Sequence, residues 1–179
     1  AVDGNFDDCQ NLVKAMFADK SFSNSINMSG VNSINWARII AQSVYYFYSY
    51  FSIEDKTQPI NFSVPTGNFG DVYAGYLAKK MGLPIGKLLV ATNQNDILHR
   101  AISKGEYNIE KVLETISPSM DIQLASNFER LLYDINNHDD VKTVSAMKDI
   151  KEKGRYKIDK DKLDKINLDF LSSRMSENE

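Results

Sequence analysis

The sequence is short of residues that mark several classes of protein. A single cysteine, Cys9, in 179 residues excludes an intrachain disulfide framework and fits a reducing compartment. The only histidines, His99 and His138, have no metal-ligand spacing, so we expect no metal site. Lys and Arg number 21 against 24 Asp and Glu, a net charge of −3. Without a basic excess, we expect no nucleic-acid partner.

The sequence also shows no pattern typical of a targeting signal or a membrane-spanning segment. The opening AVDGNFDDCQ is polar and acidic where a secretory signal would be basic and then apolar, so we expect a cytoplasmic protein. The longest apolar run, INWARIIAQSVYYFYSYF, covers residues 34–51 and contains Arg38. An Arg at the centre of a membrane-spanning helix costs about 2.5–3.5 kcal/mol. We therefore expect no membrane association.

Turn residues and hydrophobic periodicity predict alternating helices and strands. Strands are expected at 59–64 and 87–93, with a short one near Ile26 and Met28. The series strand, tight turn, helix, strand over residues 59–93 predicts parallel pairing, in an α/β fold of three αβα layers with a mainly parallel sheet. The expected helices cover residues 6–20, 34–51, 71–81 and 95–105.

Two helix starts carry specific expectations. Asn32 or Ser33 is expected to cap the helix of residues 34–51, which is apolar around most of its circumference and should be buried on most sides. Ser126 and Glu129 in SNFER match a capping box, in which each side chain bonds the backbone of the other, and predict another helix there.

The composition changes after His138. Residues 139–179 contain ten Lys and Arg and ten Asp and Glu, with few large apolar side chains. This pattern predicts a solvated, charged helical segment that follows a core formed by residues 1–138. Balanced charge gives that segment no reason to bind a polyanion.

The turn PTGNFG, residues 65–70, joins an expected strand to an expected helix. Gly67 and Gly70 allow the backbone to fold back and expose consecutive N–H groups beside the positive end of the helix dipole. Such a turn suits a phosphate, although a plain strand-to-helix turn explains the local pattern equally well. Asp71 can cap the helix, but its carboxylate would repel a phosphate unless it points away.

The turn and four other blocks together resemble the threonine synthase family. SVPTGNFGDVYAGYLAKKMGLPI is similar to the phosphate-binding loop and following helix of these pyridoxal-phosphate enzymes. Further blocks in the same order are DGNFDDCQNLVK, NSINWARIIAQSVYYF, ATNQNDILHRAISKGEY and SPSMDIQLASNFERLLYDI. The resemblance covers about residues 1–135 and implies part of the large domain of a fold-type-II enzyme.

The resemblance implies a reaction, a cofactor and site residues. Threonine synthase converts O-phospho-L-homoserine and water into L-threonine and phosphate, with pyridoxal 5′-phosphate as an electron sink. The family binds the cofactor phosphate through backbone N–H groups of its G-N-F-G turn. This carries over to Gly67, Asn68, Phe69, Gly70 and, less directly, Asp71, where the family also has Asn.

The sequence also departs from the family pattern. The family's Schiff-base lysine lies upstream of the block that begins at Asp3, and the segment that meets the pyridine nitrogen lies after the last matching block. We therefore expect an internal fragment that is inactive alone and needs the missing segments of its own polypeptide. The chain's lysines within the matching blocks are in none of the family's lysine motifs: Lys14, Lys79, Lys80, Lys87 and Lys104.

Other polar residues have both a structural and a functional interpretation. Asn32, Ser33, Asn35 and Arg38 form a polar edge, explained by capping or by an active-site cleft in which Arg38 would meet an anion. Asn93 and Asn95 follow a parallel strand, where turn formation explains them better than ligand contact does.

Three further features have structural interpretations. Cys9 is expected to be buried and structural, and His99 to lie on a helix surface. The aromatic residues 45–51 favour a core position or a contact between domains or subunits. The alternative function is a non-catalytic phosphate- or nucleotide-binding module, and a third possibility is a scaffold that binds nothing.

Overall fold

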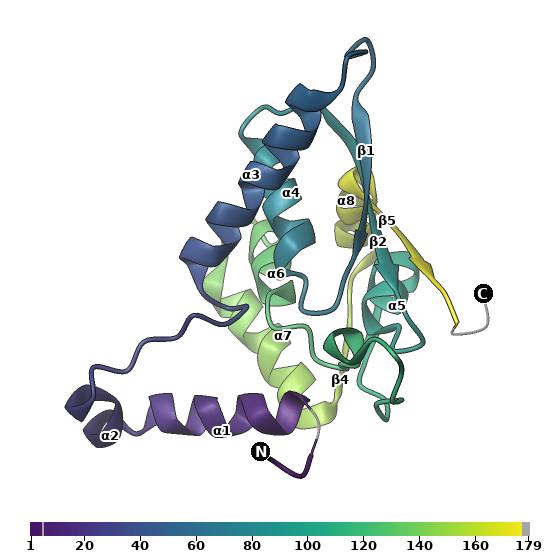
Figure 1. The fold of residues 1–179 in the computed structure, drawn as a ribbon. Coiled ribbons are helices and arrows are strands. Elements are labelled where there is room, and N and C mark those ends of the chain that lie inside the picture. Colours follow the sequence, from purple (N-terminus) through teal and green to yellow (C-terminus); the bar gives the residue numbers. More distant parts are fainter. Residues whose placement is uncertain (5, 177–179) are drawn as a thin grey trace.

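The computed structural model describes residues 1–4 and 6–176 of the chain as an α/β fold (Figure 1). Its helices are α1 (Phe6–Ala18), α2 (Lys20–Ser25), α3 (Trp36–Ser52), α4 (Gly70–Lys80), α5 (Ile97–Lys104), α6 (Phe128–Ile135), α7 (Asp140–Lys153) and α8 (Lys160–Asp169), with a short 3₁₀ helix η1 (Pro118–Met120). Its strands are β1 (Ile60–Pro65), β2 (Ile85–Thr92), β3 (Glu106–Asn108), β4 (Arg155–Lys157) and β5 (Phe170–Arg174).

The central sheet is parallel and three-stranded, in the order β1-β2-β5. Val64 of β1 pairs with Val90 of β2, which pairs in turn with Ser172 of β5. Helices α3 and α4 cover one face of the sheet and α5 lies on the other (Figure 1). The three-layer αβα arrangement with a mainly parallel sheet is confirmed. A separate antiparallel pair, β3 with β4, lies outside this sheet.

The strand–helix–strand unit around the glycine turn also forms as expected. Helix α4 begins directly after the turn and ends where Gly82 adopts φ +102°. The N–H of Leu83 then donates to the carbonyl of Ala78 at 3.1 Å, which satisfies one of the last carbonyls of α4. β2 begins at Ile85, a little before the predicted start, because its first residues already pair with β1.

Residues 139–176 differ from the solvated helical segment that was expected over 139–179. They supply α7 and α8, but also β4 and β5, and β5 is an edge strand of the central sheet. Ile150, Ile166 and Phe170 are buried in the same core as β2 and α4. These few buried side chains attach the segment to the core, although other apolar residues of it, such as Val141 and Leu168, are exposed. The expected division after residue 138 stays a prediction.

Helix α3 is buried along one side only. Ile39, Ser43 and Tyr46 face the molecule, whereas Trp36, Ile40, Val44 and Tyr48 are exposed, Tyr48 to 75%. The expected cap is also wrong. Asn35 caps the helix through its side-chain oxygen, which accepts from the N–H of Ala37 at 2.9 Å. This leaves Ser33 outside the helix and available for another role.

Residues 6–25 are mostly helical, in α1 and α2, and the short strand expected near Ile26 and Met28 does not form. Asp19 caps α2 by accepting from the N–H of Phe22 at 3.0 Å, and the residues that follow Ser25 are a turn and irregular chain. Across the described residues, none of the helices has the length and apolar character that crossing a membrane requires.

Candidate functional site

The glycine turn lies at the carboxyl edge of the parallel sheet. It follows Pro65, the last residue of β1, and leads into α4 at Gly70. Thr66 anchors its start: the N–H donates to the carbonyl of Ala91 at 2.8 Å, and the hydroxyl donates to the carbonyl of Val64 at 2.6 Å. Ligands bind parallel α/β sheets at this edge, so the turn stands where a binding site is expected.

From Gly67 onward, the backbone N–H groups of the turn have no partner among the described residues. In α4 the N–H of Tyr73 is the first to bond back, to the carbonyl of Phe69 at 3.1 Å. For the N–H groups of residues 67–72, the described part of the chain offers no acceptor. Unpaired N–H groups at a helix N-terminus, together with the helix dipole, form a site for an anion of phosphate type.

Two backbone features shape the turn. A Cβ on Gly67 would lie 2.9 Å from the carbonyl oxygen of Ser119, so only glycine lets the turn approach η1 this closely. Phe69 has φ 65°, a left-handed conformation that is uncommon for a residue with a bulky side chain. Its ring is fully buried in the core, and this burial holds the backbone in that conformation.

A small pocket of about 130 Å³ adjoins the turn. Residues 65–71 line one side, and Ser33, Arg38 and Gln42 line the other. The Ser33 hydroxyl is buried and has no hydrogen-bond partner in the described part of the molecule. Arg38 forms no ion pair with any described carboxylate; its Nη1 donates to the carbonyl of Val31 at 3.3 Å. The second interpretation of this polar edge, as the lining of a cleft, therefore has a geometric basis.

Asp71 lines the pocket but is tied to the neighbouring helix. The Tyr46 hydroxyl donates to the Asp71 backbone carbonyl at 2.9 Å and lies 3.2 Å from Oδ1 of its side chain. Burial raises the pKa of the Asp71 carboxyl above its ordinary value, and the hydrogen bond from Tyr46 opposes part of that rise.

The back of the turn is held by Ser126, which the sequence pattern assigned to a capping box with Glu129, and by its neighbour Asn127. α6 is instead preceded by Asn127, which makes no side-chain cap bond, so the predicted capping box is wrong. The Ser126 hydroxyl lies 3.1 Å from Oδ1 of Asn68, and Asn127 donates to the carbonyl of Asn68. Only tertiary proximity reveals these contacts, since nearly sixty residues separate the partners.

Asn93 and Asn95 have structural roles, as their turn position favours. Both donate to Oδ1 of Asp121, at 2.8 and 3.1 Å, and Asn95 also bonds the backbone of Leu113. Thr115 adds two more donors to the Asp121 carboxylate. This network fixes the loop that carries η1 against Gly67.

The other candidates lie away from the turn. Cys9 is exposed and free, so the expectation that it is buried is wrong. His99 is partly buried on α5, with Nδ1 3.0 Å from the Ser172 hydroxyl of β5, and does not simply decorate a surface. Over the described residues, His, Cys, Asp and Glu form no group that could hold a metal ion. Among those residues, no lysine lines the pocket at the turn.

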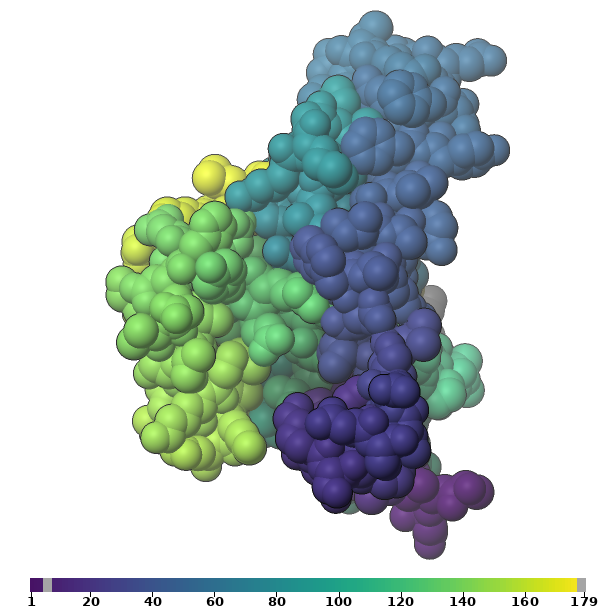
Figure 2. Space-filling view, turned by 90° about the vertical axis from the view of Figure 1, so that its left-hand side faces the viewer, coloured from purple at the N-terminus to yellow at the C-terminus, as the bar shows by residue number. Residues whose placement is uncertain are grey.

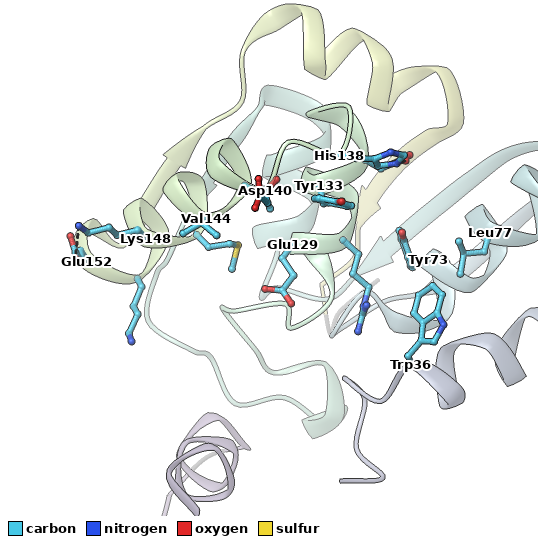
Figure 3. Close-up of a pocket in the computed structure, with 15 residues that line it drawn as sticks. Trp36, Tyr73, Leu77, Glu129, Tyr133, His138, Asp140, Val144, Lys148 and Glu152 are labelled. Carbon is cyan, nitrogen blue, oxygen red and sulfur yellow. Dashed lines mark hydrogen bonds and ion pairs between the residues drawn. The ribbon is translucent and has the colours of Figure 1, made fainter. Parts of the chain in front are cut away.

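A larger cavity, of about 970 Å³, lies between α3, α4, α6 and α7 (Figure 3). Trp36 and Tyr133 project toward it from separate helices, and α3 and α7 flank it on the surface (Figure 2). Its central carboxylate, Asp134, already accepts from Lys80 at 2.9 Å and His138 at 3.1 Å. Carboxylates of Glu129, Asp134 and Asp140 line this cavity, which makes it less suited than the glycine turn to bind an anion.

The chain has extensive similarity to known enzymes, although no family model matches it. It is 48% identical over 191 residues to threonine synthase of Saccharomyces cerevisiae, covering 100% of this chain and 37% of that protein. It is 49% identical over 159 residues to threonine synthase of Pseudomonas aeruginosa, covering 89% of this chain and 34% of that one.

Solved structures agree with these relatives. PLP-bound threonine synthase from Brucella melitensis matches with a TM-score of 0.89 and 49% identity, over 98% of this chain and 38% of that one. Yeast threonine synthase matches with a TM-score of 0.83 and 47% identity, over 98% of this chain and 36% of that one. The chain thus spans little more than a third of the length of these proteins, and its fold is that of a part of a fold-type-II pyridoxal-phosphate enzyme.

Proposed function

The chain belongs over its whole length to the threonine synthase family, and from that premise we propose that its glycine turn holds the phosphate of pyridoxal phosphate in the complete enzyme. The residues concerned are Gly67, Asn68, Phe69, Gly70 and Asp71. The observation that carries the proposal is the series of backbone N–H groups in residues 67–72 that the described chain leaves without acceptors. Each such group bonded to a charged oxygen contributes about 1.5–3 kcal/mol.

The complete enzyme converts O-phospho-L-homoserine and water into L-threonine and phosphate. The bound cofactor supplies an electron sink for carbanions formed on the substrate. The contribution of this chain to the reaction is to bind and orient the cofactor. The turn presents its N–H groups from a rigid strand–helix unit, and the buried Phe69 ring limits how far the turn can move.

Ser33 and Arg38 hold the phosphate of the substrate on the opposite side of the same pocket. Both line it; the Ser33 hydroxyl is buried without a partner, and Arg38 has a guanidinium that no described carboxylate neutralises. A guanidinium and a hydroxyl are suited to phosphate oxygens, the first through two parallel hydrogen bonds. Arg38→Ala should raise the KM for O-phospho-L-homoserine, whereas Arg155→Ala on β4 should not. An unchanged KM in Arg38→Ala would remove this role.

The lysine that carries the cofactor comes from another part of the polypeptide. Lys79 is paired with Asp169 at 2.7 Å, Lys80 with Asp134 at 2.9 Å, and Lys87 with carbonyls that include that of Leu168. These contacts hold the three ammonium groups in structural pairs. Borohydride reduction of the complete enzyme with its cofactor should therefore place the reduced adduct outside residues 1–179, and an adduct on a lysine of this segment would contradict the assignment.

The turn itself is tested by pyridoxal-phosphate titration, read by visible absorbance with inorganic phosphate as competitor. Gly67→Val should abolish or greatly weaken binding, because its side chain meets the Ser119 carbonyl. The matched control is Gly86→Val near the start of β2, away from the turn, where the new Cβ would lie 2.4 Å from Oδ1 of Asn61. Both variants therefore introduce a steric clash, but only Gly67→Val introduces it at the turn. Equal binding by the two variants would refute the proposed site. The alternative of a non-catalytic binding module has no support in the comparisons.

The complete enzyme is further proposed to be cytoplasmic. The support is the thiol of Cys9, which is exposed and free and would be prone to oxidation outside a reducing compartment. Fractionation of cells followed by immunodetection tests this, and recovery in a secreted or organellar fraction would contradict it.

A further inference from the structure

Asn127, at the start of α6, is a polar residue with no exposed surface. Its side-chain Nδ2 donates to two carbonyls from distant segments, that of Ser33 at 2.9 Å and that of Asn68 at 3.0 Å. Its backbone N–H donates to the same Asn68 carbonyl at 3.1 Å. One buried side chain therefore joins the two sides of the small pocket, since Ser33 lines one and Asn68 the other.

Arg130 fixes the orientation of the Asn127 amide. Its Nε donates to Oδ1 of Asn127 at 3.0 Å, so that atom is the acceptor and the NH₂ group must face the two carbonyls. Arg130 also donates through Nη2 to the carbonyl of Ile34 at 3.0 Å and stacks on Trp36, with 5.2 Å between the guanidinium carbon and the ring centroid. Two residues at the start of α6 therefore hold the Ser33 side of the pocket: Asn127 through the Ser33 carbonyl and Arg130 through the Ile34 carbonyl.

The contact to Asn68 has a consequence for the turn. The carbonyl of Asn68 and the N–H of Phe69 belong to one planar trans peptide, so they point in opposite directions. Because two donors of Asn127 draw the carbonyl toward α6, the N–H of Phe69 is directed away from α6. Gly70 permits this approach, since a Cβ there would lie 3.3 Å from Nδ2 of Asn127.

We propose that Asn127 is a positioning residue that holds the substrate side and the cofactor side of the anion pocket in register. Asn127 is not among the residues that line the pocket, so it acts through Ser33 and Asn68. Its two carbonyl partners would repel each other without a donor between them, and the segment before α3 would then separate from the turn. The inference rests on the proposed function, because it concerns how the pocket is shaped to receive the phosphate of the cofactor and the phosphate of the substrate.

The test uses a complete threonine synthase carrying this sequence, with three variants. Asn127→Asp keeps an acceptor for Arg130 and nearly the same shape, but loses both side-chain donors. Asn127→Ala removes donors and acceptor without adding charge, and serves if the Asp variant does not fold. Asn136→Asp is the matched control, an equally buried asparagine at the other end of α6 that donates to Thr143.

Three quantities are measured on the folded fraction, which urea denaturation defines: the dissociation constant for pyridoxal phosphate from visible absorbance, the KM for O-phospho-L-homoserine, and kcat. A loss of two hydrogen bonds at the pocket should raise both the dissociation constant and the KM by at least about tenfold in the Asn127 variants. Asn136→Asp should change neither by more than about twofold.

Each other outcome is decisive. Wild-type constants in a folded Asn127 variant would mean that the residue serves packing alone and would overturn the inference, while the proposed function would stand. A change in only one of the two constants would overturn the claim that Asn127 joins both sides. Failure of the wild-type enzyme to bind pyridoxal phosphate would instead refute the proposed function, and the inference would fall with it.

Discussion

The ring of Phe170, the first residue of β5, lies 5.7 Å from the ring of Phe69 in the glycine turn, measured between centroids. Phe128 contacts the same ring edge-on at 5.4 Å. The one turn residue with a strained, positive φ is therefore anchored by aromatic side chains from α6 and from the last strand. The conformation of the glycine turn therefore depends on a core that α6 and β5, much later in the chain, complete.

Phe170→Ala should destabilise the protein by about 3–5 kcal/mol, because it leaves a cavity beneath the turn. The free energy of unfolding from urea denaturation measures this. Phe51→Ala is the control, since Phe51 is 67% exposed on α3 and should cost less than about 0.5 kcal/mol in this chain. Similar losses in the two variants would contradict the importance of the contact.

Gly75→Ala should be destabilising, although alanine normally favours a helix by about 1 kcal/mol over glycine. The added Cβ would lie 2.4 Å from Cε1 of Tyr46, whose hydroxyl is tied to Asp71 and whose ring cannot move freely. Overpacking of this kind costs about 1–3 kcal/mol. Denaturation midpoints of Gly75→Ala, Tyr46→Leu and the double variant measure it. Strict additivity would exclude a clash between the two side chains.

Asp96→Asn should destabilise the protein at neutral pH by about 1.5–3 kcal/mol. Asp96 bridges α5 and β5 by accepting from Arg100 at 2.8 Å and Arg174 at 3.2 Å. Burial alone would raise the pKa of this carboxyl, but the two guanidinium groups hold it below its ordinary value of 3.8. The stabilisation is therefore present above pH 3.8 and is lost as the pH falls through the lower, folded-state pKa.

The measurement is the free energy of unfolding against pH for the wild type and Asp96→Asn. The two curves should converge in acid and separate toward neutral pH. Glu152→Gln, at an exposed carboxylate near the end of α7, is the control and should follow the wild type throughout. A constant offset between wild type and Asp96→Asn at every pH would contradict the role of ionisation.

Asp71→Asn should have the opposite pH dependence. Burial raises the pKa of Asp71 above its ordinary value of 3.8, so the folded protein favours the protonated form. The stability associated with that proton is complete below pH 3.8 and is lost as the pH rises through the folded-state pKa. Relative to Asp71→Asn, the wild type should become less stable over this range, and the variant should bind inorganic phosphate more tightly at neutral pH. Weaker phosphate binding by the variant would contradict a repulsive carboxylate.

Much of the fold follows from local pattern. The strands at 59–64 and 87–93 and the helix between them form almost as expected, because Gly82, the apolar runs and the tight turn leave few alternatives. β5 was not predictable in the same way. Its residues FLSSR follow a charged helix and alternate weakly, and only pairing with β2 makes them a strand.

The candidate site, like the fold, has one part that local sequence predicts and another that only tertiary packing decides. The amino-acid sequence alone determined that a two-glycine turn precedes a helix after a strand, and therefore that unpaired N–H groups would gather there, because backbone geometry near glycine is a local property. Only the tertiary structure decided what surrounds those groups. Asn35, and not Ser33, caps α3, which leaves the Ser33 hydroxyl in the pocket. Ser126 bonds Asn68 of the turn instead of forming a capping box with Glu129, and Asn127 bonds the same residue. Capping is a competition between neighbours for the same N–H groups, and packing against distant segments determines which neighbour prevails.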